Sequence, residues 1–94
     1  MTTPNSDNTV VFKSVEPFFS KEEKGIKPNT VREIDMSDRR FLKLVKWYGY
    51  GRENIFIKIV NATDSPGLVD ESFTREIQDI SFYKNLCIIS WVHV

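Results

Sequence analysis

The stretch that decides the fold of this chain is Gly25-Ile26-Lys27-Pro28-Asn29-Thr30-Val31-Arg32. Its glycine follows a short polar segment and is typical of a helix C-terminus, where a positive φ is needed. The residues that follow are typical of a strand, so Thr30 and Arg32 share one face and Val31 takes the other. Lys27 lies just before that strand and can lean over the same face. The stretch therefore predicts an ammonium, a hydroxyl and a guanidinium close together.

Two elements are predicted before this stretch. β-Branched and aromatic residues over 9–15 predict a first strand. Residues 17–24 predict a short helix with Pro17 at its first position, where the missing N–H costs nothing. We expect Phe18 and Phe19 to face the core and residues 20–24 to face solvent.

After a second strand over 30–34 and a turn over 35–38, residues 39–48 admit two interpretations. Phe41, Leu44, Val45 and Tyr48 have the i, i+3, i+4, i+7 spacing of a helix. The alternative is a strand over 41–47, but its alternation is poor, so the pattern favours the helix. We expect a loop over 49–52, which contains two glycines.

The C-terminal half predicts three more strands. The clearest covers 54–60, where isoleucines alternate with other residues, and a turn follows over 61–67. A hairpin partner is expected over 72–77 and a polar or helical turn over 78–85. The almost wholly apolar segment 86–94 predicts a last strand, central and covered on both sides.

These elements fit one small α+β domain over residues 9–94, preceded by a flexible polar lead over 1–8. About five strands and one or two short helices fit a half-open β-barrel. The 94 residues carry 13 basic and 13 acidic side chains, and this balance argues against strong non-specific binding of duplex DNA. It leaves room for a small basic pocket that takes one nucleotide or a short single strand.

Composition also bears on cofactors and location. One cysteine and one histidine predict no internal disulfide and no metal site, and we expect no cofactor. Neither a signal peptide nor an apolar stretch of the ~20 residues that span a bilayer is seen, so we expect no membrane partner and a cytoplasmic location. Cys87 and Trp91 are expected in the core, and nothing pairs His93 with a nucleophile.

The pattern Gly25-x-Lys27-x-x-Thr30-x-Arg32, after a short helix and at the start of a strand, resembles the signature of the ASCH domains. These are small β-barrels of the PUA-like superfamily. The resemblance implies a PUA-like barrel whose cleft binds RNA or nucleotides through Lys27, Thr30 and Arg32. In one branch, amidohydrolases that act on acetylated cytidine, the motif lysine and threonine are catalytic together with a later glutamate.

The candidates for that glutamate are Glu71 and Glu76, and Glu33 and Asp79 are secondary candidates for the same acidic role. Glu76 alternates with Arg75 on its predicted strand, so it can face the cleft, although no spacing forces this. The segment between the hairpin and the last strand is shorter here than in the catalytic branch. Surface ion pairs are the plainer interpretation of these carboxylates.

The segment 39–52 is basic and aromatic and contains no acidic residue. Arg52 and Tyr50 could close over the cleft, because basic groups follow a phosphate backbone and aromatic rings stack on bases. The plainer interpretation is an amphipathic helix that covers the barrel, with Trp47 and Tyr48 as core anchors.

Three hypotheses about function follow. The first is a nucleotide- or single-stranded-RNA-binding module with a site made of Lys27, Thr30 and Arg32, and Arg32→Ala should then abolish binding with folding nearly intact. The second is an amidohydrolase on a modified pyrimidine nucleoside, with Lys27 as base, Thr30 as nucleophile and Glu71 or Glu76 as acid. The third is a phage-encoded protein that binds a host protein, because chains of this size resemble such proteins.

Overall fold

The computed structural model describes residues 3–50, 54–62 and 71–92, and it leaves the side chains of 48–50 undescribed. Its elements, in chain order, are β1 (Thr9–Ser14), α1 (Phe18–Glu23), β2 (Asn29–Glu33), α2 (Arg39–Tyr50), β3 (Phe56–Asn61), β4 (Ser72–Tyr83) and β5 (Leu86–Trp91). Five strands and two helices are thus present in this part of the chain. The predicted small α+β architecture is confirmed.

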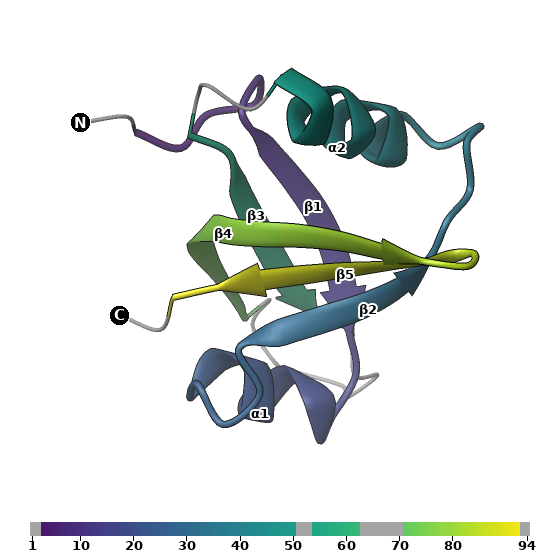
Figure 1. Ribbon diagram of the computed structural model, residues 1–94. Helices are drawn as coiled ribbons and strands as arrows, with labels where there is room; N and C mark the ends of the chain where they lie inside the picture. Colours follow the sequence, from purple (N-terminus) through teal and green to yellow (C-terminus); the bar gives the residue numbers. More distant parts are fainter. Residues whose placement is uncertain (1–2, 51–53, 63–70, 93–94) are drawn as a thin grey trace.

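The five strands form one mixed sheet with the order β1-β3-β4-β5-β2. The β1–β3 pair is parallel and the other three pairs are antiparallel. The sheet curls into a half-barrel, with the helices at opposite ends of it (Figure 1). Because β1 and β2 end the strand order, both keep a free edge, and these edges border the open side of the half-barrel.

Strand β4 joins the two halves of the sheet. Its first residues pair with β3, and the part from Ile77 onward pairs with β5, with a register shift between Ile77 and Asp79. The predicted turn over 78–85 is therefore wrong, because the strand continues to Tyr83. The irregularity explains the error: it places Ile77 and Ile80, three residues apart, both in the core, which breaks the strand alternation.

Helix α2 confirms the helical interpretation of residues 39–48. Asp38 caps it, since its Oδ1 accepts a hydrogen bond of 2.9 Å from the N–H of Arg40. Phe41 and Leu44 are buried, as the spacing predicts. The helix runs on to Tyr50, so the predicted loop over 49–52 is wrong at its first two residues, and its other two lie outside the described residues.

Helix α1 corrects two predictions. Phe19 is buried, but Phe18 is 51% exposed, and Glu22 on the supposed solvent side is only 1% exposed. Neighbouring residues of a helix point about 100° apart, so Phe18 cannot share the core face with Phe19, whereas a residue three positions later can. The inward face of α1 therefore carries Phe19 and Glu22.

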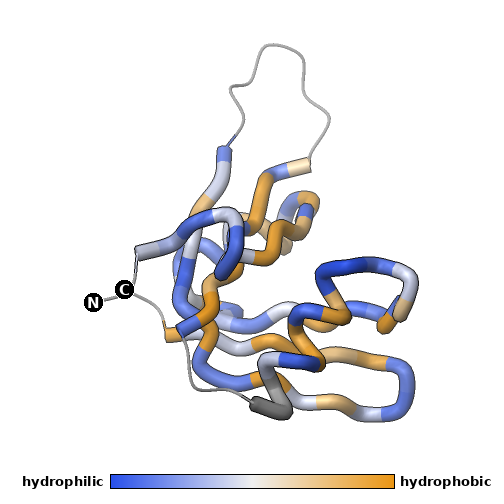
Figure 2. The backbone as a smooth tube through the Cα atoms, turned by 90° about the horizontal axis from the view of Figure 1, so that it is seen from above, coloured by the Kyte–Doolittle hydropathy of each residue, from blue (hydrophilic) through white to orange (hydrophobic). Residues whose placement is uncertain are grey.

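The core lies inside the curl of the sheet, and Figure 2 shows hydrophobic residues running along the strands with mainly hydrophilic residues in the connections. Cys87 is fully buried there and Trp91 is 2% exposed, as predicted. Strand β5 lies between β4 and β2, which confirms its interior place in the sheet. Its residues alternate between buried and half-buried, so only one face is fully covered, and His93 lies outside the described residues.

Candidate functional site

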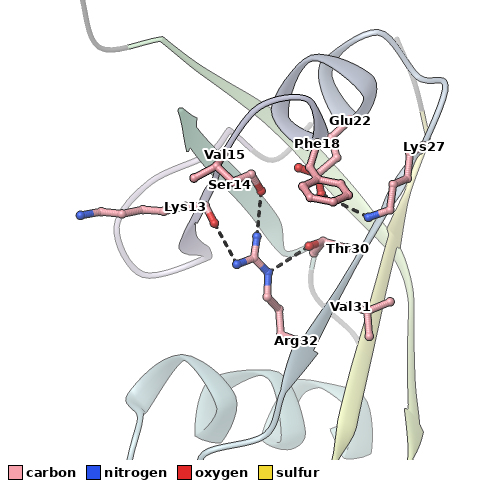
Figure 3. Close-up of a pocket in the computed structure, with 9 residues that line it drawn as sticks. All are labelled: Lys13, Ser14, Val15, Phe18, Glu22, Lys27, Thr30, Val31 and Arg32. Atoms are coloured by element: carbon pink, nitrogen blue, oxygen red, sulfur yellow. Dashed lines mark hydrogen bonds and ion pairs between the residues drawn. The ribbon is translucent and has the colours of Figure 1, made fainter. Parts of the chain in front are cut away.

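A pocket of about 430 Å³ opens where α1 meets the free edges of β1 and β2 (Figure 3). This volume is in the range of small-molecule sites. The lining residues come from all three elements and the segments that follow β1 and α1: Lys13, Ser14, Val15, Phe18, Glu22, Lys27, Thr30, Val31 and Arg32. Lys27, Thr30 and Arg32, the three motif residues predicted as a ligand site, thus line one pocket.

Arg32 spans the pocket from β2 to β1. Its Nη1 donates to the main-chain carbonyl of Lys13 at 2.8 Å, and its Nη2 donates to Ser14 Oγ at 2.9 Å. The guanidinium also lies 5.0 Å from the ring centre of Phe12, at cation–π distance. Burial lowers the pKa of Arg32, and the nearby positive charge of Arg40 acts the same way, while Glu22 opposes both.

Thr30 lies beside Arg32 on the same face of β2, as the strand alternation predicts. Its side chain is buried, and its Oγ1 accepts a hydrogen bond of 2.9 Å from Arg32 Nε. Because the hydroxyl accepts from Arg32, its own proton remains to be donated elsewhere. Val31 points to the other face and is 47% exposed.

Lys27 is held at the end of α1. Its main-chain N–H donates to the carbonyl of Lys21 at 3.0 Å, while its Nζ donates to the carbonyl of Asn29 at 3.2 Å. Nζ also lies 3.7 Å from Glu22 Oε2 and 5.9 Å from the ring centre of Phe18. The ammonium is thus fixed over one wall of the pocket.

Glu22 is the site residue that the sequence interpretation missed. Its side chain is 1% exposed and lines the pocket, and its Oε1 is buried without a hydrogen-bond partner among the described residues. The sequence spacing does indicate that Glu22 is buried, because Glu22 follows the apolar Phe19 by three positions and so shares its helix face. A buried carboxylate oxygen that accepts no hydrogen bond needs an explanation, since burying such a group carries a large desolvation cost.

Apolar side chains form the rim of the pocket. Val15 and Phe18 line it and are 49% and 51% exposed, while Val31 borders the pocket but directs its side chain to the other face of β2. Exposed apolar groups around a concave polar site are typical of a ligand-binding surface. The Phe18 ring lies beside the Glu22–Lys27 ion pair, with its centre 5.9 Å from Lys27 Nζ, and offers a flat face for stacking (Figure 3).

The other predicted site residues lie elsewhere. Glu76 pairs with Phe56 across β4 and β3 and accepts a hydrogen bond from Asn54, and it is not among the residues that line this pocket. Glu71, Glu33 and Asp79 do not line it either. The Tyr50 side chain and Arg52 lie outside the described residues.

A second hollow, of about 520 Å³, adjoins the first and shares Lys13 and Arg32 with it. Arg40 lines this hollow, where it pairs with Asp38 and donates from Nη1 to the carbonyl of Val11 at 2.8 Å. The hydrogen bond from Arg40 lowers the pKa of Asp38, and the same contact raises the pKa of Arg40. Two arginines thus hold carbonyls on the free edge of β1.

Within residues 3–50, 54–62 and 71–92, no group of three or more His, Cys, Asp or Glu side chains is placed to hold a metal ion. Neither helix of that part of the chain has the length and apolar character needed to cross a membrane. No protein-family model matches the chain, and no curated protein and no solved structure matches it. The resemblance to ASCH domains stays a prediction.

Proposed function

We propose that this protein binds a nucleotide or a short single strand of RNA in the pocket between α1, β1 and β2. The observation that carries the proposal is the convergence of Lys27, Thr30 and Arg32 on one open pocket with the half-exposed ring of Phe18 at its rim. The proposal takes the half-barrel as PUA-like, on the strength of the motif that resembles ASCH domains.

The chemistry of the pocket suits such a ligand. Arg32 uses three of its five N–H groups on protein acceptors, so two remain for a phosphate or a sugar hydroxyl. Lys27 adds a positive charge, and the proton of the Thr30 hydroxyl can serve a ligand acceptor. A base that stacks on an aromatic ring gains about 1–3 kcal/mol, and Phe18 offers such a ring.

Thermal unfolding with a panel of nucleosides, nucleotides and short RNA and DNA strands tests the proposal. A ligand at 100 times its Kd adds about 2.7 kcal/mol to the free energy of unfolding, which is seen as a raised midpoint. Phe18→Ala should reduce that shift, because the ring is half exposed and its loss leaves the core intact. The matched control is Ile26→Ala, which removes another exposed apolar side chain that does not line the pocket.

If no member of the panel shifts the midpoint, the proposal fails. The third hypothesis, a protein that binds a host protein, would then gain weight. That hypothesis places the partner at the aromatic residues 47–50, of which Trp47 packs partly buried against the core and the side chains of 48–50 lie outside the described residues.

Hydrolysis of an acetylated cytidine is a second candidate, and one observation favours it. Lys27 and Thr30, the motif residues that are catalytic in the branch described above, line the same pocket as the buried carboxylate of Glu22. On this hypothesis Glu22, rather than Glu76, is the acid. Release of acetate that is lost in Thr30→Ala would support the hydrolase, and absence of turnover at high protein concentration would exclude it.

A further inference from the structure

The solvent-facing side of α2 carries a group of cations that the pocket does not use. Arg39 and Lys46 are exposed and Lys43 is half-buried, and spacings of four and three residues place all three on one face of the helix. Phe41 and Leu44 take the opposite face, where they are buried in the core. The surface made by Arg39, Lys43 and Lys46 is called the basic face of α2 below.

The basic face has no counter-charge beside it in the part of the chain that the structure describes. No carboxylate there forms an ion pair with Arg39, Lys43 or Lys46, and Lys43 Nζ donates only to a neutral acceptor, the carbonyl of Ser6, at 3.4 Å. Helix α2 itself contains no acidic residue. Since the whole chain balances 13 basic against 13 acidic side chains, this positive charge is local, and such a surface attracts a polyanion.

The second hollow connects α2 with the pocket. It shares Arg32 with the pocket, and Arg40 and Phe41 of α2 also line it. Helix α1, beside the pocket, and helix α2 lie at opposite ends of the half-barrel (Figure 1). The charged side chains that line the hollow balance one another: Lys13, Arg32, Arg40, Glu33, Asp35 and Asp38. A ligand can therefore extend from the pocket to α2 without crossing a region of net negative charge.

We infer that the ligand of this protein is a single strand of RNA rather than a free nucleotide. One nucleotide lies in the pocket between α1, β1 and β2, and phosphates further along the strand contact the basic face of α2. This inference rests on the proposed function and narrows it to the strand. Each cation that neutralises a phosphate releases a counterion, and such contacts do not depend on the base. The basic face therefore adds affinity that is independent of sequence.

The apolar side chains of α2 argue against a membrane or a protein as the partner of its basic face. A helix that lies on a lipid surface inserts its apolar face, but Phe41 and Leu44 are already buried in the core. Of the described side chains of α2, only Leu42 and Val45 are both apolar and exposed, at 48% and 38%. A stable protein interface has a larger apolar centre. A phosphate chain needs only the cations.

Titration at several salt concentrations tests the inference, with each of the four nucleoside monophosphates and with an unstructured RNA of about eight nucleotides that contains all four bases. The strand should bind about tenfold or more tightly than the best nucleotide. In Arg39→Gln/Lys43→Gln/Lys46→Gln, its dependence of log K on log salt should become shallower by about 2, because each phosphate contact of a single strand contributes about 0.7. Affinity for the nucleotides should not change, since they fill the pocket alone.

The matched control is Lys24→Gln/Lys58→Gln/Lys84→Gln, which removes the same charge from exposed lysines that line neither hollow. Glutamine has nearly the helix propensity of lysine and arginine, so the α2 variant should fold. Equal affinities of the two triple variants for the strand would overturn the inference. So would equal binding of the strand and the best nucleotide by the wild type, and in either case the proposed function stands.

Two further results would count against the inference. If neither the nucleotides nor the strand bind the wild type, the inference and the proposed function both fail. Cosedimentation with phosphatidylserine vesicles that is lost in the α2 variant, while its binding of the strand is unchanged, would make the basic face a lipid contact and overturn the inference alone.

Discussion

The guanidinium of Arg32 donates a hydrogen bond of 2.8 Å to the main-chain carbonyl of Lys13, and so connects β2 to β1 across the open side of the half-barrel. These two strands lie at opposite ends of the sheet order. Arg40 makes a second connection of this kind, from the residue after the start of α2 to the carbonyl of Val11. Side chains thus satisfy edge carbonyls of β1 that no neighbouring strand pairs.

Arg32→Ala should destabilise the protein, in contrast to the sequence-based expectation that folding stays nearly intact. The change removes three hydrogen bonds from a half-buried charged group and leaves the Lys13 carbonyl, Ser14 and Thr30 without their donor. Hydrogen bonds that involve a charged group contribute about 1.5–3 kcal/mol each in favourable cases and are not additive, so we expect a loss of about 2–3 kcal/mol. Urea unfolding followed by Trp fluorescence measures it.

Arg39→Ala is the matched control for that prediction, because Arg39 is exposed at the start of α2. Its loss should change the free energy of unfolding by less than about 0.5 kcal/mol. Arg32→Lys keeps the charge but not the planar fork of donors, so its stability should fall between those of the wild type and Arg32→Ala. Equal stability of Arg32→Ala and Arg39→Ala would contradict the bridging role.

Glu22→Gln should keep or raise the thermal midpoint. The wild-type carboxylate is buried, and the ammonium of Lys27 at 3.7 Å compensates only part of its desolvation. A neutral amide of the same shape removes that cost. Differential scanning calorimetry at pH 7 compares the two, with Glu23→Gln as control, and a clear drop in the midpoint of Glu22→Gln alone would show that the charge stabilises the fold.

Cys87 should resist alkylation in the native protein. It is fully buried in β5, and burial raises the pKa of its thiol to about 11, from 9.0 in the exposed side chain. Only the thiolate reacts with iodoacetamide, so little modification is expected at pH 8 until denaturant is added. Mass spectrometry after timed exposure measures this, and rapid native labelling would contradict the buried position.

The same thiol affects stability in alkali. Above pH 9 the unfolded chain loses the Cys87 proton while the folded chain keeps it, so this residue lowers the free energy of unfolding as the pH rises from about 9 to about 11. Comparison of urea midpoints for the wild type and Cys87→Ala across that range isolates the effect. The difference between the two proteins should change with pH in that window and be constant below it.

Asp38 should stabilise the protein only where it is ionised. Its hydrogen bonds with the side chain and N–H of Arg40 lower its pKa from the ordinary 3.8, so its contribution is present above that pH and is lost as the pH falls through the lower, folded value. Asp38→Asn should therefore lower the midpoint at pH 7 and lower it less at pH 3. An equal decrease of the midpoint at pH 7 and at pH 3 would show that ionisation of Asp38 does not contribute to stability.

Local sequence determined much of this protein. Gly25 takes the positive φ of 78° that its place after α1 predicts, Thr30 and Arg32 share a strand face, and residues 39–48 are helical as the spacing of Phe41 and Leu44 indicates. These features depend on dihedral preferences and on the periods of helices and strands. Both are properties of a few neighbouring residues.

Only the tertiary structure decided the rest. Nothing near Arg32 in the sequence indicates that its partners are Lys13 and Ser14, because the curl of the sheet is what brings the two edge strands together. The continuation of β4 past Ile77 depends on pairing with β5, which outweighs a broken local alternation. The burial of Glu22 follows from docking α1 by Phe19, and the helix could have turned the other way in another fold. The position of this buried carboxylate at the pocket was thus fixed by packing, which depends on contacts that a linear sequence does not display.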